Sequence, residues 1–101
     1  MKYVMIDHKI PICFPDELVH SSFTYFGKIT SAGFVSTKGK VTVFGKSVSL
    51  NIGPEEGDQL IITGFLRGYS TIDIINLASL GLDPLASAIY SLLEEREEKY
   101  K

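Results

Sequence analysis

The stretch that decides the fold is "ITSAGFVSTKGKVTVF", residues 29–44. β-Branched and aromatic residues dominate its two ends, as is typical of strands, and the polar break at 37–40 separates them. Because the break contains Gly39, we expect a hairpin turn of about three residues between the two strands. The second strand is expected to continue to residue 50, and Gly45 inside it is typical of a bulge or a close backbone approach.

The N-terminal segment "KYVMIDHKIPICF" predicts a second pair of strands. Two apolar runs, 2–6 and 9–14, flank Asp7-His8, which indicates a tight turn between them. Pro11 has no backbone N–H to donate, so we expect the second run to be an edge strand.

A short helix is expected to follow these strands, over about residues 17–26. Asp16 is a good residue to cap its first turn, and Gly27 a good residue to end it. On this helix we expect Leu18, Phe23 and Phe26 to face the core.

The second half of the chain is predicted to be helical. Pro54-Glu55-Glu56 is a helix-start pattern and favours a helix over 54–66, although "LIITGF" alone is also compatible with a strand. Ser70 is expected to cap a helix over 71–80 that Gly81 ends, and Asp83-Pro84 to begin one that runs toward residue 99.

Together these elements predict an α+β fold: a small mixed sheet with helices packed on it, in two layers or a sandwich, and a C-terminal helical pair. The chain has 101 residues, near the common size of one domain, and contains neither repeats nor a linker. We therefore expect a single domain over 1–101.

The composition excludes several classes of protein. The formal charge is −2, and the ten Lys and Arg residues are scattered, so no basic face for nucleic acid is expected. The apolar runs are too short to cross a membrane, and the N-terminus is too polar for a secretory signal. With one cysteine and two histidines we expect no metal site, no cofactor and a reducing compartment, hence a soluble cytoplasmic protein.

His20 is the first candidate for chemistry. Histidine is the side chain most easily poised for proton transfer near neutral pH. The alternative is a structural histidine whose ring nitrogen bonds a backbone carbonyl, and the sequence leaves both open.

The second candidate is "GKSVSLN", residues 45–51. In a strand, Ser47 and Ser49 would share one face, and two hydroxyls beside backbone amides after a glycine can hold an anion. The alternative is a strand whose outer face is simply polar.

The order of these features resembles the Janus-type phosphohistidine phosphatases. The likeness rests on "MKYVMI", "LVHSSF", "SAGFVS", "VTVFGKS" and "IGP", within about residues 2–66. It implies a mixed sheet with helices on both sides, His20 as the general base that activates water, and a phosphoryl group held by Lys2, Ser21 and the segment from Ser47 to Ser49. Where the family keeps an arginine in its glycine-rich strand, this chain has Phe34.

Three motifs, "ICFPDELVH", "SAGFV" and "GKSVSL", also resemble a set of small bacterial and phage proteins. That likeness implies no activity.

Two functions are therefore expected as alternatives. One is binding of a phosphorylated small molecule or protein, with hydrolysis of a phosphoramidate at His20. The other is a non-enzymatic regulatory or interaction module that uses its C-terminal helices, where Leu85, Ile89, Leu92 and Leu93 form an apolar stripe that either closes the core or pairs with a second copy in a homodimer.

Overall fold

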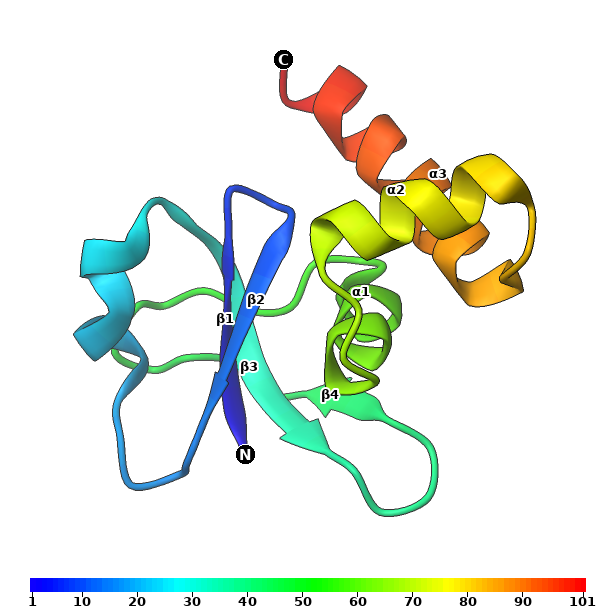
Figure 1. Ribbon diagram of the computed structural model, residues 1–101. Coiled ribbons are helices and arrows are strands. Elements are labelled where there is room, and N and C mark those ends of the chain that lie inside the picture. The colour runs from blue at the N-terminus through cyan, green and yellow to red at the C-terminus, as the bar shows by residue number, and fades with distance from the viewer. The chain divides into compact units, whose positions relative to one another are not determined.

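Two hairpins form a four-stranded antiparallel sheet in the computed structural model, which describes residues 1–101 (Figure 1). The strand order is β2-β1-β3-β4. The strands are β1 (Lys2–Ile6), β2 (Ile10–Phe14), β3 (Ile29–Ser36) and β4 (Thr42–Phe44), and the helices are η1 (His20–Phe26), α1 (Asp58–Leu66), α2 (Thr71–Leu80) and α3 (Pro84–Lys99). The α+β class and the C-terminal helical pair are confirmed, whereas the sheet is antiparallel throughout instead of mixed.

The first hairpin has the tight turn that the sequence predicts. Asp7 and His8 have φ of 50° and 64°, and the amide of Lys9 donates to the carbonyl of Ile6 at 3.0 Å. Such left-handed pairs match the twist of the flanking strands. Strand β2 lies at an edge of the sheet, as expected from Pro11.

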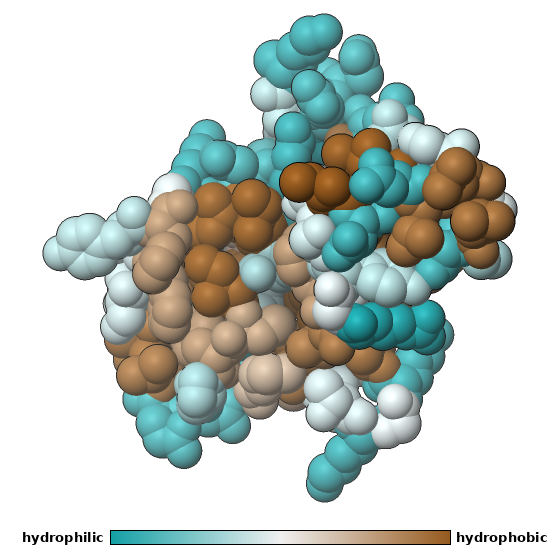
Figure 2. Space-filling model, viewed as in Figure 1, coloured by the Kyte–Doolittle hydropathy of each residue, from teal (hydrophilic) through white to brown (hydrophobic).

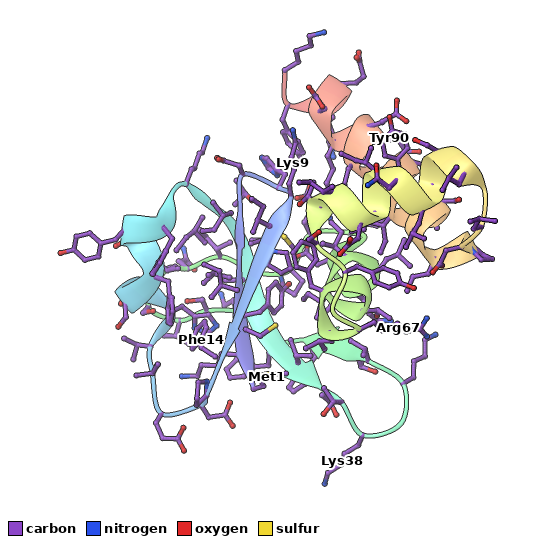
Figure 3. The ribbon with its side chains drawn as sticks, in the orientation of Figure 1. Met1, Lys9, Phe14, Lys38, Arg67 and Tyr90 are labelled. Carbon is purple, nitrogen blue, oxygen red and sulfur yellow. The ribbon has the colours of Figure 1, made fainter.

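One hydrophobic cluster holds the sheet and η1 together. Its buried members come from β1, β2 and β3, namely Val4, Ile6, Phe14 (labelled in Figure 3) and Ala32. Phe23 of η1 and Leu50 of the later loop pack against them, so the cluster fixes both segments that flank the candidate site.

The predicted helix over 17–26 is wrong in its start and its type. The chain forms a 3₁₀-helix from His20 with Val19 at the N-cap and no side-chain cap, because the Asp16 carboxylate instead pairs with the amino group of Met1 at 3.1 Å. Gly27 ends it as predicted. Leu18 and Phe26 are exposed instead of facing the core.

The predicted strand over 41–50 is also too long. Gly45 takes a φ of +66°, which favours glycine, and turns the chain out of the sheet after Phe44. Residues 47–52 then form a tight loop in which Ser47 and Ile52 exchange backbone hydrogen bonds of 2.8 and 3.3 Å. Ser47 and Ser49 therefore lie on a turn and do not share a strand face.

Residues 54–66 contain a helix, as favoured, but it begins later than predicted. Gly57 has a φ of +93°, so helix α1 starts at Asp58 and not at Pro54. Glu55 and Glu56 precede the helix instead of forming its first turn.

Helices α2 and α3 have the predicted bounds. Ser70 and Asp73 form a reciprocal capping box at the start of α2, and Gly81 ends it in the left-handed conformation. The Asp83 carboxylate accepts the amides of Leu85 and Ala86 at the start of α3.

The chain divides by its contacts into two compact units, Met1–Gln59 and Leu60–Lys101, with the boundary inside α1. The single domain stays a prediction. No single helix is long and apolar enough to cross a membrane, and α2 with α3 passes that test only as a pair bent by 111°.

Candidate functional site

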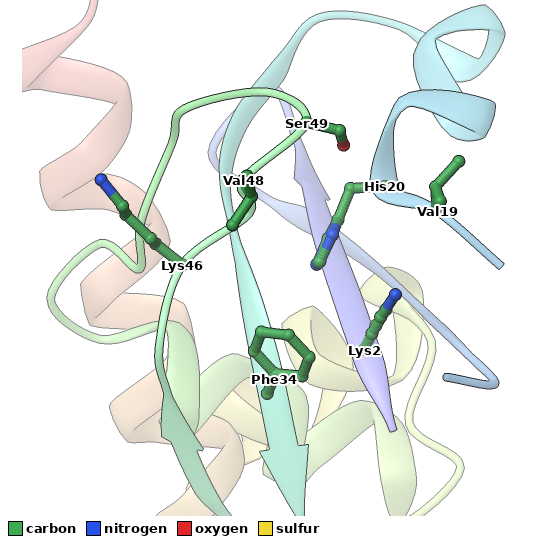
Figure 4. Close-up of a pocket in the computed structure, with 7 residues that line it drawn as sticks. All are labelled: Lys2, Val19, His20, Phe34, Lys46, Val48 and Ser49. Atoms are coloured by element: carbon green, nitrogen blue, oxygen red, sulfur yellow. The ribbon is translucent and has the colours of Figure 1, made fainter. Parts of the chain in front are cut away.

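A cavity of about 300 Å³ lies in the first unit, between β1, β3, η1 and the loop after Gly45 (Figure 4). Its size is at the lower end of the range for small-molecule sites. Seven residues line it: Lys2, Val19, His20, Phe34, Lys46, Val48 and Ser49.

Lys2 supplies an ammonium group to this cavity from the first residue of β1. Its Nζ donates to the carbonyl of Leu18 at 2.9 Å and lies 5.9 Å from the centroid of the Phe34 ring. An ammonium has three N–H donors, so the Leu18 bond orients the group and leaves others for a ligand. The aromatic ring below it also favours the cation.

His20 is 3% exposed and lies between two aromatic rings. The rings of Phe14 and Phe34 meet it edge to face, with centroid distances of 5.4 and 5.7 Å. Its Nε2 lies 2.9 Å from the carbonyl oxygen of Gly33. Because a carbonyl only accepts, Nε2 carries the hydrogen, and in the neutral ring the lone pair is on Nδ1.

The surroundings of His20 are therefore compatible with both alternatives, a structural histidine and a catalytic one. The carbonyl bond is what a structural histidine needs, and the cavity is what a catalytic one needs. The same bond also fixes the tautomer, which is how a histidine base is usually prepared.

The carbonyl that holds His20 belongs to Gly33, where β3 is in close contact with its neighbours. A Cβ at this position would lie 2.9 Å from the backbone oxygen of Phe44 and 3.2 Å from Pro54. Glycine at position 33 therefore allows the backbone of β4 to approach closely.

The three predicted serines have different places. Ser49 lines the cavity, and its hydroxyl lies 3.3 Å from that of Ser47. Ser47 is fully buried behind it and accepts the amide of Leu50 at 3.1 Å, so it supports the loop. Ser21 is exposed and does not line the cavity, and the seven-residue η1 is too short to add a useful dipole.

Sequence reasoning missed Lys46, Val19 and Val48. Lys46 stood within the quoted "GKSVSL" motif, and a search for cations beside Gly45 would have found it. Its Nζ lies 3.5 Å from Oδ1 of Asn51, and Figure 4 shows its side chain directed away from the other lining residues. The cavity wall thus contains no carboxylate, and the Lys2 ammonium is the charge that favours an anion there.

A metal has no evident place here, since no group of three or more His, Cys, Asp and Glu side chains is arranged to hold one. The thiol of Cys13 is not an activated nucleophile either. Burial raises its pKa, which disfavours the thiolate.

A second polar cluster, around Asp58, is fully enclosed and structural. Oδ2 of Asp58 accepts from the hydroxyls of Tyr3 and Ser31 at 2.7 and 2.6 Å and from the amide of Glu55 at 2.9 Å. It ties the first turn of α1 to β1 and β3.

No protein-family model, no curated protein and no solved structure matches this chain.

Proposed function

We propose that this protein binds a phosphoryl group in the cavity of Figure 4. One observation carries the proposal: Lys2, His20 and Ser49, three of the residues expected from the sequence, line one cavity that contains no carboxylate. A phosphoryl dianion there would meet an oriented ammonium and a hydroxyl, the kinds of donor that phosphate prefers.

The reaction we propose is hydrolysis of a phosphoramidate, in line with the resemblance to the Janus-type phosphohistidine phosphatases. Nδ1 of His20 accepts a proton from water as the water oxygen bonds to phosphorus. The P–N bond breaks, and the proton is returned to the leaving nitrogen. Lys2 offsets the charge on the phosphoryl oxygens, which is the main contribution a protein makes to such transfers.

Binding is tested by amide NMR titration of the protein with inorganic phosphate and phosphoramidate. We expect the shifts to gather at Lys2, His20 and Ser49. In Lys2→Met the apolar stem remains and the ammonium is lost, so the affinity should fall at least about tenfold, as for loss of one charge-assisted bond. Lys40→Met, at an exposed site outside the cavity, is the matched control. Shifts spread evenly over the surface lysines would refute the site.

Catalysis is tested separately with His20→Gln. The glutamine amide can still donate to Gly33 but supplies no base, so binding should persist while turnover of phosphoramidate falls by about 100-fold or more. His20→Ala is a poor substitute, because the buried ring packs between Phe14 and Phe34 and its loss should lower stability. Equal turnover in His20→Gln and wild type would remove His20 from the mechanism.

The exposed apolar residues of the second unit favour a different function, pairing with a second copy of the chain. On α3, Ile89 is fully buried and Leu85, Leu92 and Leu93 are half-buried, so that stripe closes a core. The exposed residues belong instead to α2 and the turn after it, where Figure 2 shows apolar surface: Ile72, Ile75, Leu80 and Leu82. Apart from its capping Asp73, α2 carries no charge, so two copies would meet without repulsion.

Sedimentation over a range of concentrations tests this second function. A homodimer that pairs through α2 should dissociate in Leu80→Asp and persist in Ser91→Asp, which adds the same charge at an exposed position of α3. A monomer at every concentration would exclude self-pairing.

A further inference from the structure

The apolar residues of the cavity wall restrict what the anion can be attached to. Three of the seven lining side chains are Val19, Phe34 and Val48. Val48 is 87% exposed and Val19 is 50% exposed, so both present methyl groups to solvent at the cavity. A ligand that covers these valines removes apolar surface from water, which strengthens binding. An inorganic anion covers them poorly.

The ammonium group of Lys2 lies close to the apolar part of the cavity wall. Nζ of Lys2 lies over the Phe34 ring, 5.9 Å from its centroid. An anion held by Nζ at about 3 Å, the usual length of such a bond, is therefore beside an aromatic wall. Whatever carries the anion must continue along apolar surface.

The polar groups of the wall are too few to bind a sugar or another polyhydroxylated body. The Nε2–H of His20 is used by Gly33, and the Lys2 ammonium and the Ser49 hydroxyl are the groups that the proposed phosphoryl group occupies. Lys46 is directed away from the other lining residues (Figure 4). A hydroxylated ligand would thus cover valine and phenylalanine with polar groups and gain little from the burial of apolar surface.

We infer that the ligand of this cavity is a phosphate monoester or phosphoramidate of an aromatic or other apolar group, with its anion on Lys2 and its body covered by Val19, Phe34 and Val48. This inference rests on the proposed function and specifies its substrate class. The anion provides the charge pairing, and the body provides the burial of the exposed valines.

The experiment compares four probes by NMR titration of the full chain: phenyl phosphate, methyl phosphate, inorganic phosphate and phenol. Phenyl phosphate should bind at least about tenfold more tightly than methyl phosphate, since even one added methylene in an apolar site gives about that factor. Phenol should bind at least about tenfold more weakly than phenyl phosphate, because it lacks the dianion.

Val48→Ser shows whether the apolar wall is responsible. The side chain is almost wholly exposed, so the variant should fold like the wild type. It should lower the affinity for phenyl phosphate several-fold and change that for methyl phosphate much less. Tyr25→Ser removes an exposed aromatic ring outside the cavity, and both affinities should remain as in the wild type.

The outcomes separate the two proposals. Phenyl and methyl phosphate of equal affinity, or no effect of Val48→Ser on either, would overturn the apolar substrate class and leave the phosphoryl site in place. If neither ester shifts Lys2, His20 or Ser49, the phosphoryl site itself fails, and the substrate class fails with it. Phenol as tight as phenyl phosphate would show an apolar pocket in which the anion has no role.

Discussion

Asp58 is the residue on which the first unit depends most for its polar interior. One carboxylate oxygen accepts the hydroxyls of Tyr3 and Ser31 and the amide of Glu55, and the side chain is fully buried. Asp58→Ala would leave two buried hydroxyls without this acceptor. We expect it to lower the free energy of unfolding by at least about 3 kcal/mol, since hydrogen bonds to charged groups contribute about 1.5–3 kcal/mol each.

Urea unfolding measures that loss, with Ser31→Ala as the comparison. Ser31→Ala removes one donor and leaves the other two in place, so it should cost clearly less. If the two variants unfold at the same urea concentration, Asp58 is not the hub of the cluster.

Gly33 is the residue that connects packing with the candidate site. A Cβ there would lie 2.9 Å from the backbone oxygen of Phe44, and backbone cannot move aside as a side chain can. Gly33→Ala should therefore destabilise the protein by about 1–3 kcal/mol, the usual cost of overpacking. It should also displace the carbonyl that holds His20, which the His20 ring signals would report by NMR.

Gly53→Ala provides the control for Gly33. Its added Cβ would meet only the Lys46 side chain, at an ordinary 3.6 Å. Thermal unfolding should place Gly53→Ala near the wild type, and a similar loss in both alanine variants would contradict the packing argument.

At the level of elements, the caps of α2 and α3 should make the protein sensitive to acid. A hydrogen bond from the hydroxyl of Tyr69, followed by one from the amide of Ala86, lowers the pKa of Asp83, and the Ser70 amide lowers that of Asp73. A carboxyl with a lower pKa in the folded state stabilises the fold above its unfolded pKa of about 4. This stabilisation is lost as the pH falls through the folded pKa.

Asp83→Asn isolates this effect, because asparagine is also a good N-cap but does not titrate. Between pH 7 and pH 2 the wild type should lose more free energy of unfolding than Asp83→Asn does, as followed by circular dichroism in urea. Ser70→Ala should instead cost about 1 kcal/mol at all pH values where Asp73 is ionised. Parallel pH profiles for wild type and Asp83→Asn would show that the Asp83 charge is not stabilising.

The elements that the sequence predicted well are those whose ends are set by local chemistry. Ser70, Gly81, Asp83 and Pro84 give the bounds of α2 and α3 correctly because capping involves residues only a few positions apart. Asp16 is an equally good cap, but its carboxylate pairs with the amino group of Met1, a partner distant in sequence. The same holds for Gly45, since whether it forms a bulge or ends a strand depends on tertiary contacts.

The residues of the candidate site were predictable only in part. His20 and Ser49 were candidates from their own chemistry and Lys2 from the resemblance alone, and the three line one cavity. Ser21 and Ser47 do not line it, because the 3₁₀ form of η1 and the loop over 47–52 orient those side chains differently from a helix and a strand. The apolar part of the wall was not predictable, since an exposed valine has no signature in sequence.

At the scale of the whole molecule, helix α1 is the element that contains the boundary between the two units. Its first residues belong to the first unit: Asp58 bonds to β1 and β3, and Oε1 of Gln59 accepts the amide of Val43 in β4. Its later residues belong to the second unit, where a Cβ at Gly64 would lie 2.5 Å from the Ile89 side chain. A nine-residue helix is too short to persist alone in water, so α1 depends on its packing against other parts of the chain.

We therefore expect the two units to unfold together as one domain. Far-UV circular dichroism reports mainly α2 and α3, and the ring signals of His20 in NMR report the first unit. Their transitions in urea should coincide, as in a two-state protein. Gly64→Leu, which would force the α1–α3 contact apart, should shift both midpoints equally, whereas Ser79→Ala on the exposed side of α2 should shift neither. Two separate transitions, with the Gly64→Leu effect confined to the far-UV signal, would mean that the chain is two domains that share a helix only covalently.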